Sequence, residues 1–204
     1  MIKKIIKTLS VISIFLIIAI IYFSLFGLKT EKFNSQITDN ILKINKKIEL
    51  KLGKVSYLFN PYNLTINIKT KNPQILLNGK SLKIKDIKTN VSLKSLINNQ
   101  FLIDDLKIST KEIKLNDIIS LLRTFQNSPQ VFILDTIIKD GLITANIDLN
   151  FDEKGKIKEN YKIQGHVKKA KLNIINRLKL QNLNFNFYVE KNTYLLKKIN
   201  MTLN

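Results

Sequence analysis

The sequence offers very few side chains for nucleophilic or metal chemistry. The 204-residue chain has one histidine, His166, and no cysteine. A Ser-His-Asp or Cys-His arrangement would therefore have to be built around His166, and a disulfide framework is excluded. A zinc site would depend on carboxylates almost alone, which is unusual for that metal. Because His166 follows Gly165 in a strand-like pattern, we expect a structural or exposed role for it, with no metal site and no cofactor.

The adjacent acidic residues would serve general acid–base catalysis only if their carboxyl groups faced each other. Asp104 and Asp105 are neighbours in a predicted strand, so their side chains point to opposite sheet faces and cannot share that task. Asp152 and Glu153 fall in a turn, where water surrounds them. The sequence therefore predicts no catalytic residues and no enzyme, although a pair brought together by folding among the 15 acids stays open.

The chain is strongly basic, and two interpretations of that charge stay open. Lys and Arg number 34 against 15 acids, for a formal charge of +19, and only Arg123 and Arg177 are arginines. Drift in an AT-biased genome accounts for such an excess of Lys, and so does selection for anionic partners. Arginine is the residue of bidentate base and phosphate contacts, so its scarcity argues against nucleic acid. Lys168, Lys169 and Lys171 either meet lipid phosphates or form a solvated edge.

The amino-terminal segment predicts a retained membrane anchor. From Thr8 to Leu28 there are 21 consecutive uncharged residues, enough for a helix across a hydrocarbon core of about 30 Å. Three lysines precede this stretch and the flank after it is nearly neutral, which places the amino terminus in the cytoplasm. The apolar core is too long for a cleaved signal peptide. We expect a single-pass anchor over residues 1–29 in a bacterial inner membrane, with residues 30–204 in the periplasm.

Residues 31–47 follow the anchor and carry an apolar stripe at helical spacing. The stripe recurs every three or four residues, and it is the candidate for a membrane-surface helix: Phe33, Ile37, Ile41, Ile44 and Ile48. Such a stripe packs on the domain core, lies on the membrane surface, or closes one end of a sheet. The sequence leaves these three alternatives open.

From residue 48 onward the apolar period changes to two, which is typical of strands with one apolar and one polar face. Turn signals at 60–61, 72–73 and 140–141 separate the strands, and a phase change at 168–169 indicates a bulge. Residues 131–138 are predicted as a strand, and 116–126 as a short helix capped by Asn116.

The predicted fold is mainly β with helices: a long antiparallel meander whose apolar face needs a cover. With few short helices, the sheet either closes on itself around a filled core or curls into an open groove suited to acyl chains. We predict the groove, lined by three apolar rows: Leu64, Ile66 and Ile68; Ile143, Ala145, Ile147, Leu149 and Phe151; and Leu183, Phe185, Phe187 and Val189.

The order of these segments resembles the beginning of AsmA-like proteins, including the TamB and YhdP branches. The resemblance is carried by LFNPYNLTI at 58–66, LKIKDI at 82–87, VSLKSL at 91–96 and FLIDDLKI at 101–108, and later by 140–141 and 161–167. It implies an inner-membrane-anchored periplasmic protein with a repeating β-groove, linked to phospholipid traffic and outer-membrane assembly. The family brings no catalytic residues, and its members are usually several times longer than this chain.

These observations predict a non-enzymatic protein that takes part in phospholipid transport or outer-membrane assembly. The expected partners are a phospholipid or another acyl-chain lipid, the inner membrane, and an envelope protein that pairs with the carboxy-terminal edge strand. Two alternatives stay open: a membrane-anchored scaffold with a closed β core, and a subunit of a lipopolysaccharide-export bridge. Whether the apolar face is open separates the groove from the scaffold.

Overall fold

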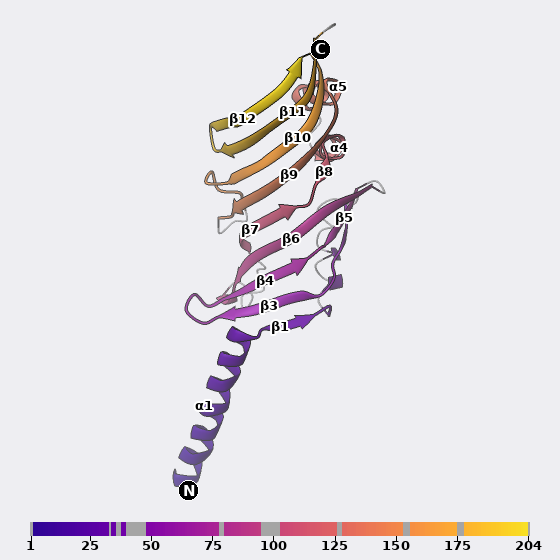
Figure 1. The fold of residues 1–204 in the computed structure, drawn as a ribbon. Coiled ribbons are helices and arrows are strands. Elements are labelled where there is room, and N and C mark those ends of the chain that lie inside the picture. The colour runs from indigo at the N-terminus through magenta and orange to yellow at the C-terminus, as the bar shows by residue number, and fades with distance from the viewer. Residues whose placement is uncertain are drawn as a thin grey trace.

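The computed structural model describes residues 2–32, 34–35, 38–39, 48–77, 80–94, 103–125, 128–152, 156–174 and 178–203. An apolar amino-terminal helix projects away from one end of a long, twisted β-sheet, and two short helices lie beside the other end (Figure 1). The predicted class, mainly antiparallel β with helices, is confirmed.

Helix α1 (Ile2–Leu25) is the predicted anchor segment. Its stretch Lys3–Leu25 has a mean hydropathy of 2.5 and is long and apolar enough to cross a membrane, with none of its apolar window buried in the protein. The helix ends before Gly27, whose φ of 64° turns the chain into strand β1 (Leu28–Thr30). A Cβ at Gly27 would stand 2.5 Å from the carbonyl oxygen of Tyr57, so only glycine fits this joint.

Twelve strands in the described residues form one sheet, with antiparallel pairing throughout. After β1 the strands are β2 (Ile48–Lys51), β3 (Val55–Asn60), β4 (Thr65–Lys71), β5 (Gln74–Leu77), β6 (Lys80–Ser92), β7 (Ile103–Thr110), β8 (Ile113–Lys114), β9 (Ile138–Asn150), β10 (Lys162–Ile174), β11 (Leu178–Glu190) and β12 (Thr193–Leu203). The pairing path runs β1-β3-β4-β6-β7-β9-β10-β11-β12, with β2, β5 and β8 as side extensions. The sheet is not closed, so the closed β core of the scaffold alternative is wrong.

The strand register gives the sheet one apolar and one polar face. Because side chains alternate along a strand, residues paired across the ladder share a face. One such row is almost entirely apolar and crosses eight strands: Val55, Thr70, Ile87, Ile108, Ile147, Ile163, Val189 and Tyr194. The neighbouring row on the opposite face is polar: Ser56, Lys69, Lys88, Lys107, Asp148, Lys162, Glu190 and Thr193.

A line of backbone irregularities crosses the sheet at one level. It separates β2 from β3, β4 from β5 and β7 from β8, and it shifts the register inside β6, β10 and β11. The predicted bulge at 168–169 is confirmed, since the register shifts between Val167 and Ala170 and Lys169 has a φ of 50°. Asn182 and Lys198 also have positive φ values, at 52° and 55°. Bulges bend strands, and the β9–β12 ribbons curve strongly in Figure 1.

Two helices occupy the chain between β8 and β9. Helix α4 (Leu115–Phe125) confirms the predicted short helix, but Asn116 lies inside it and donates to the Lys139 carbonyl oxygen at 3.3 Å instead of capping. The strand predicted at 131–138 is wrong, because helix α5 (Pro129–Ile137) forms there. The Ser128 hydroxyl accepts a hydrogen bond from the Val131 amide and Pro129 occupies the first turn, both helix-start signals. A short apolar run suits a strand or a buried helix equally, so periodicity alone misassigned it.

The turn predicted at 140–141 is also wrong, because both residues lie inside β9. Gly141 has a φ of 141°, and the Asp140 carboxylate accepts a hydrogen bond from the Gly141 amide at 2.8 Å. A Cβ at Gly141 would stand 2.6 Å from the Leu115 Cδ1 atom. This glycine therefore bends the strand, and its lack of a Cβ atom allows the start of α4 to pack against the sheet.

The candidate membrane-surface helix falls largely outside the described residues, which exclude Phe33, Ile37, Ile41 and Ile44. Ile48 begins strand β2, so its assignment to the helix is wrong. The described residues 34–35 and 38–39 are helical. Asn34 Nδ2 donates to the Leu52 and Gly53 carbonyl oxygens at 3.2 and 3.0 Å, and the Thr38 hydroxyl donates to the Leu50 carbonyl oxygen at 3.2 Å. These bonds place Asn34 and Thr38 against β2 and the residues that follow it, at one end of the sheet.

Candidate functional site

Most predicted groove residues lie within strands, on the apolar face of the sheet. Ile66 and Ile68 are in β4, four others are in β9 (Ile143, Ala145, Ile147 and Leu149), and four are in β11 (Leu183, Phe185, Phe187 and Val189). Two assignments to strands are wrong. Leu64 ends a turn closed by the Asn60 side chain, has a φ of 49° and is 58% exposed. Phe151 lies beyond β9, in an isolated bridge to Ile157.

Helix α4 covers one part of this face. Leu115, at its start, is buried in a cluster with Val167, Ala170 and Leu183. Three more predicted groove residues pack against that cluster: Ile143, Phe185 and Phe187. These four candidates therefore belong to the core beneath α4. Of these four, Leu183 is buried, and Ile143, Phe185 and Phe187 are partly buried. The candidates outside the cluster are also partly buried: Ile66, Ile68, Ala145, Ile147, Leu149 and Val189.

The apolar face is barest at β12, the last strand of the sheet. Every residue of β12 is exposed, and Tyr194 is 75% exposed. Tyr194 pairs with Val189, and Leu196 pairs with Phe187, so both extend the apolar face. Three further large apolar residues of the strand are each at least half exposed: Ile199, Met201 and Leu203. Exposed apolar side chains grouped in this way are typical of an interaction surface.

The opposite, polar face holds a hollow of about 660 Å³. Its walls come from strands β6 to β12, because cross-strand pairs such as Gln164–Asn146 and His166–Asn186 stand side by side. The lining residues are Lys85, Ser109, Thr110, Thr144, Ala145, Asn146, Gln164, Gly165, His166, Asn186, Phe187, Tyr188, Leu195 and Lys197. Sequence reasoning missed this hollow because it read the polar positions only as the solvated side of each strand.

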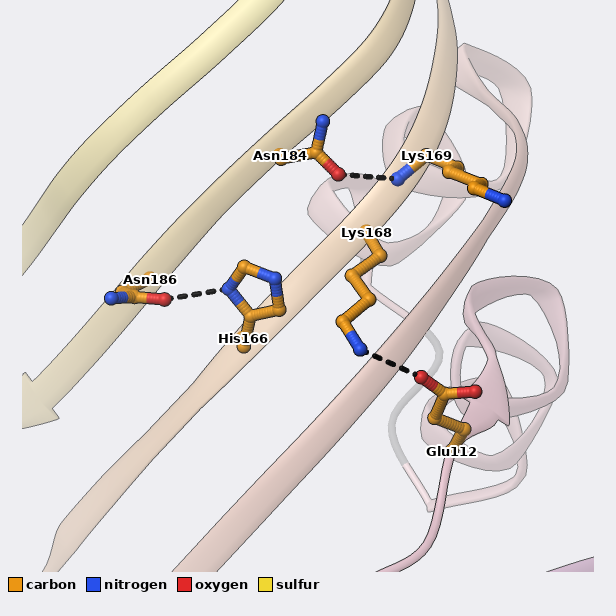
Figure 2. A network of polar contacts seen from close by, with 6 residues as sticks. All are labelled: Glu112, His166, Lys168, Lys169, Asn184 and Asn186. Carbon is orange, nitrogen blue, oxygen red and sulfur yellow. Dashed lines mark hydrogen bonds and ion pairs between the residues drawn. The ribbon is translucent and has the colours of Figure 1, made fainter.

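His166 lines the hollow and, among the described residues, forms one side-chain hydrogen bond. Its Nδ1 atom is 2.6 Å from the Asn186 Oδ1 atom (Figure 2). The amide oxygen accepts, so Nδ1 carries the proton and Nε2 is left for water or a ligand. In the part of the chain that the structure describes, no carboxylate contacts the ring. This geometry orients the imidazole without building a nucleophile–base pair around it.

The other residues singled out for chemistry are separated in the fold. The Lys168 ammonium pairs with Glu112 at 3.0 Å, and the Lys169 amide donates to Asn184 Oδ1 at 3.0 Å (Figure 2). The Asp105 carboxylate accepts from the Asn90 amide at 2.8 Å, while Asp104 is exposed. None of these contacts joins two carboxyl groups.

A polar cluster borders the hollow on β10 and β11. The Tyr188 hydroxyl donates to Glu190 Oε2 at 2.8 Å, and the Lys162 ammonium lies 3.4 Å from Glu190 Oε1. The hydrogen bond from Tyr188 and the nearby Lys162 lower the pKa of Glu190. The same carboxylate raises the pKa of Tyr188 and of Lys162 through its hydrogen bonds. Glu190 is therefore a hydrogen-bonded carboxylate whose charge is offset by Lys162.

Compared with known proteins, the chain matches no protein-family model and has no significant sequence match to a curated protein. The features that bear on function are therefore those of the chain itself: a membrane-length helix, a bare apolar sheet face and a polar hollow behind it.

Proposed function

We propose that this protein is a membrane-anchored, non-enzymatic lipid carrier whose apolar sheet face forms a groove for acyl chains. It takes part in phospholipid transport or outer-membrane assembly at a bacterial inner membrane. The observation that carries the proposal is the apolar row that crosses eight strands, from Val55 to Tyr194, in a sheet joined directly to a membrane-length helix. Soluble monomers rarely leave an apolar face of this extent without a cover.

The energetics favour an acyl chain as the occupant of this face. Nine strands along the pairing path, at about 4.8 Å each, give a face roughly 40 Å long. Each methylene group that moves from water onto such a surface contributes about 0.8 kcal/mol. The polar headgroup would stay at the sheet edge, near lysine side chains, because burying its charge is unfavourable. A passive face of this kind lets lipid follow its gradient, so direction has to come from elsewhere.

The charge around α1 supports the proposed orientation. Lys3, Lys4 and Lys7 lie at its amino-terminal end, and positive flanks stay on the cytoplasmic side. The sheet then lies in the periplasm, within reach of lipids that leave the outer leaflet of the inner membrane.

Site-specific photo-crosslinking in the native membrane tests the groove. We would place p-benzoylphenylalanine at Ile66 or Ile147 on the apolar face, and at the neighbouring Asn67 or Asp148 on the polar face. Each pair differs by one residue in sequence and by the face on which the probe sits. We expect acyl-lipid adducts, identified by mass spectrometry, from the apolar positions only. Equal labelling of both faces, or none on the apolar face, would contradict the proposal.

We also propose that β12 is the edge through which an envelope protein docks. An exposed edge strand presents a row of free backbone donors and acceptors that templates a further strand. Strand β12 has 11 residues, all exposed. The same crosslinker at Leu196 is expected to give a protein adduct of defined mass, whereas the exposed Ile133 on α5 gives none. Adducts of equal yield at both positions would show non-specific contact.

A further inference from the structure

The hollow on the polar face has the size and chemistry of a small-molecule site, and it lies on the side of the sheet opposite the proposed groove. Its volume of about 660 Å³ falls in the usual range for such sites, roughly 300–1,000 Å³. None of its described lining residues is acidic. Hydroxyl and amide side chains predominate: Ser109, Thr110, Thr144, Asn146, Gln164, Asn186 and Tyr188.

Two uncompensated cations stand on this lining. Lys85, on β6, and Lys197, on β12, form no ion pair with a described carboxylate. Four of the strands in the pairing path lie between β6 and β12, so the two ammonium groups approach the hollow from opposite sides. Three nearby lysines differ, because Lys88, Lys162 and Lys168 each pair with an acid. The hollow therefore carries two positive charges that no described carboxylate offsets.

Four of the remaining polar side chains are oriented by hydrogen bonds within the sheet: Thr110, His166, Asn186 and Tyr188. The Thr110 hydroxyl accepts a hydrogen bond from the Ala145 amide at 2.8 Å, which leaves its own proton to donate. The bond between His166 Nδ1 and Asn186 Oδ1 leaves Nε2 as a further polar atom. Because the Tyr188 proton goes to Glu190, the Tyr188 oxygen remains an acceptor. Donors and acceptors of this mixture suit a polyhydroxylated ligand, and the two lysines suit an anionic group on it.

We propose that this hollow binds a phosphate-bearing polyol, with Lys85 and Lys197 attracting the phosphate from the two sides of the hollow and the amide and hydroxyl side chains contacting the hydroxyl groups. A lysine ammonium binds phosphate as a point charge, and two of them without carboxylate partners attract an anion into the hollow. The same chemistry is offered by a free sugar phosphate and by the glycerophosphate headgroup of an anionic lipid. The polar side chains of the site lie on the face of the sheet opposite the acyl-chain groove, and two groove candidates, Ala145 and Phe187, also border the hollow.

His166 provides a direct readout, because it is the only histidine in the chain. Full-length protein with ¹³C-labelled histidine, in phosphatidylcholine nanodiscs, gives one imidazole signal that reports on the hollow. The free source is tested with glucose 6-phosphate against glucose, and the lipid source by replacing part of the phosphatidylcholine with phosphatidylglycerol. We expect a saturable shift of the His166 signal with glucose 6-phosphate, with phosphatidylglycerol, or with both, and no shift with glucose.

Matched charge variants assign the effect to the two lysines. The double variant Lys85→Gln, Lys197→Gln is expected to weaken binding at least ten-fold. Lys179→Gln, an exposed lysine of β11 outside the lining, is expected to leave it unchanged. The control also shows whether lowering the net charge alone has an effect.

The outcomes separate cleanly. A shift with glucose 6-phosphate alone would identify the ligand as a free sugar phosphate. A shift with phosphatidylglycerol alone would identify it as a lipid headgroup, and either result supports the site. No shift with either probe, an equal shift with glucose, or equal weakening by Lys179→Gln overturns it. Acyl-lipid crosslinking at Ile147 is read separately, so failure of the hollow and failure of the groove are distinguishable.

Discussion

The two ends of the apolar face share one sequence pattern but differ in burial. Near the anchor, Val55, Leu82 and Val91 are 1%, 2% and 0% exposed. At the far end, Tyr194 and Leu196, which extend the same apolar face, are 75% and 54% exposed, and Leu203 is 61% exposed. The difference teaches that alternation sets which face a residue takes, whereas burial depends on what packs over that face.

The covering elements explain this difference. At the near end, Asn34 and Thr38 hydrogen-bond to backbone carbonyl groups of residues 50–53, and α1 packs on β3. Farther along, α4 packs on β9, and α5 packs on β9 and β10. In the described residues no helix lies over β12 (Figure 1). The near end is therefore a conventional core, and the far end is the part of the face that is available to a ligand or a partner.

A leucine-to-alanine substitution should show the largest difference between the two ends in its effect on the free energy of unfolding. Leu82→Ala removes a buried side chain and leaves a cavity, so we expect the free energy of unfolding to fall by about 3 kcal/mol. Leu203→Ala removes a side chain already in water and should change it by less than about 0.5 kcal/mol. Urea unfolding of the full chain in detergent, followed by circular dichroism, measures both. Equal losses would mean that β12 is covered in solution.

Two glycines on the line of backbone irregularities, one at each end of the sheet, should differ next most in their effect on the free energy of unfolding. Gly141→Ala, at the far end, forces a Cβ against Leu115 and Ala170 at a φ that L-residues rarely adopt, so we expect a loss of about 2 kcal/mol. Gly53→Ala, at the near end, meets nothing within 4 Å and should be close to neutral. The same unfolding measurement applies. A neutral Gly141→Ala would show that α4 is not seated against β9.

Removing the amino-terminal cap of α5 tests how stably this helix covers the sheet at the far end. Ser128→Ala removes the hydroxyl that accepts from the Val131 amide, and loss of such a cap costs about 1 kcal/mol. Ser56→Ala, on the polar face of β3, is the matched control and should be nearly silent. Hydrogen exchange should then accelerate in 129–137 and remain unchanged in β3. Unchanged exchange in α5 would contradict the assigned cap.

The smallest effect concerns Glu190, whose pKa is lowered by the Tyr188 hydroxyl and by Lys162. A lowered pKa stabilises the fold above the ordinary value of 4.5, and that contribution is lost as pH falls through the folded-state pKa. The difference in melting temperature between the wild type and Glu190→Gln should therefore shrink as the pH falls from 6 to below about 4. Asp86→Asn, at the near end, serves as the control. A difference that grows at low pH would reverse the assignment.

Much of the fold was predictable from the sequence because the deciding interactions are local. The apolar helix, the period-two strands and the bulge at 168–169 follow from composition and spacing. The errors have local causes too. Residues 131–138 carry an apolar run that suits a helix or a strand. The helix forms because Ser128 caps it and Pro129 occupies its first turn. Residues 140–141 look like a turn, yet Gly141 is needed for contact with α4.

For the candidate groove residues, the sequence predicted the face of the sheet but not the burial of each side chain. Alternation selected Ile66, Ile147 and Val189 for the apolar face, because side-chain direction in a strand is fixed by the backbone. It did not separate them from Leu183, which is buried beneath α4. That distinction depends on a helix arriving from another part of the chain.

The sequence by itself determined the membrane-length helix, the strands and the face each side chain takes, since these follow from short-range periodicity. Only the tertiary structure decided which parts of the apolar face are covered, and that Lys85 and Lys197 share one hollow although 112 positions separate them in the chain (197 minus 85). Register and curvature bring such residues together, and both depend on long-range pairing that no local pattern encodes.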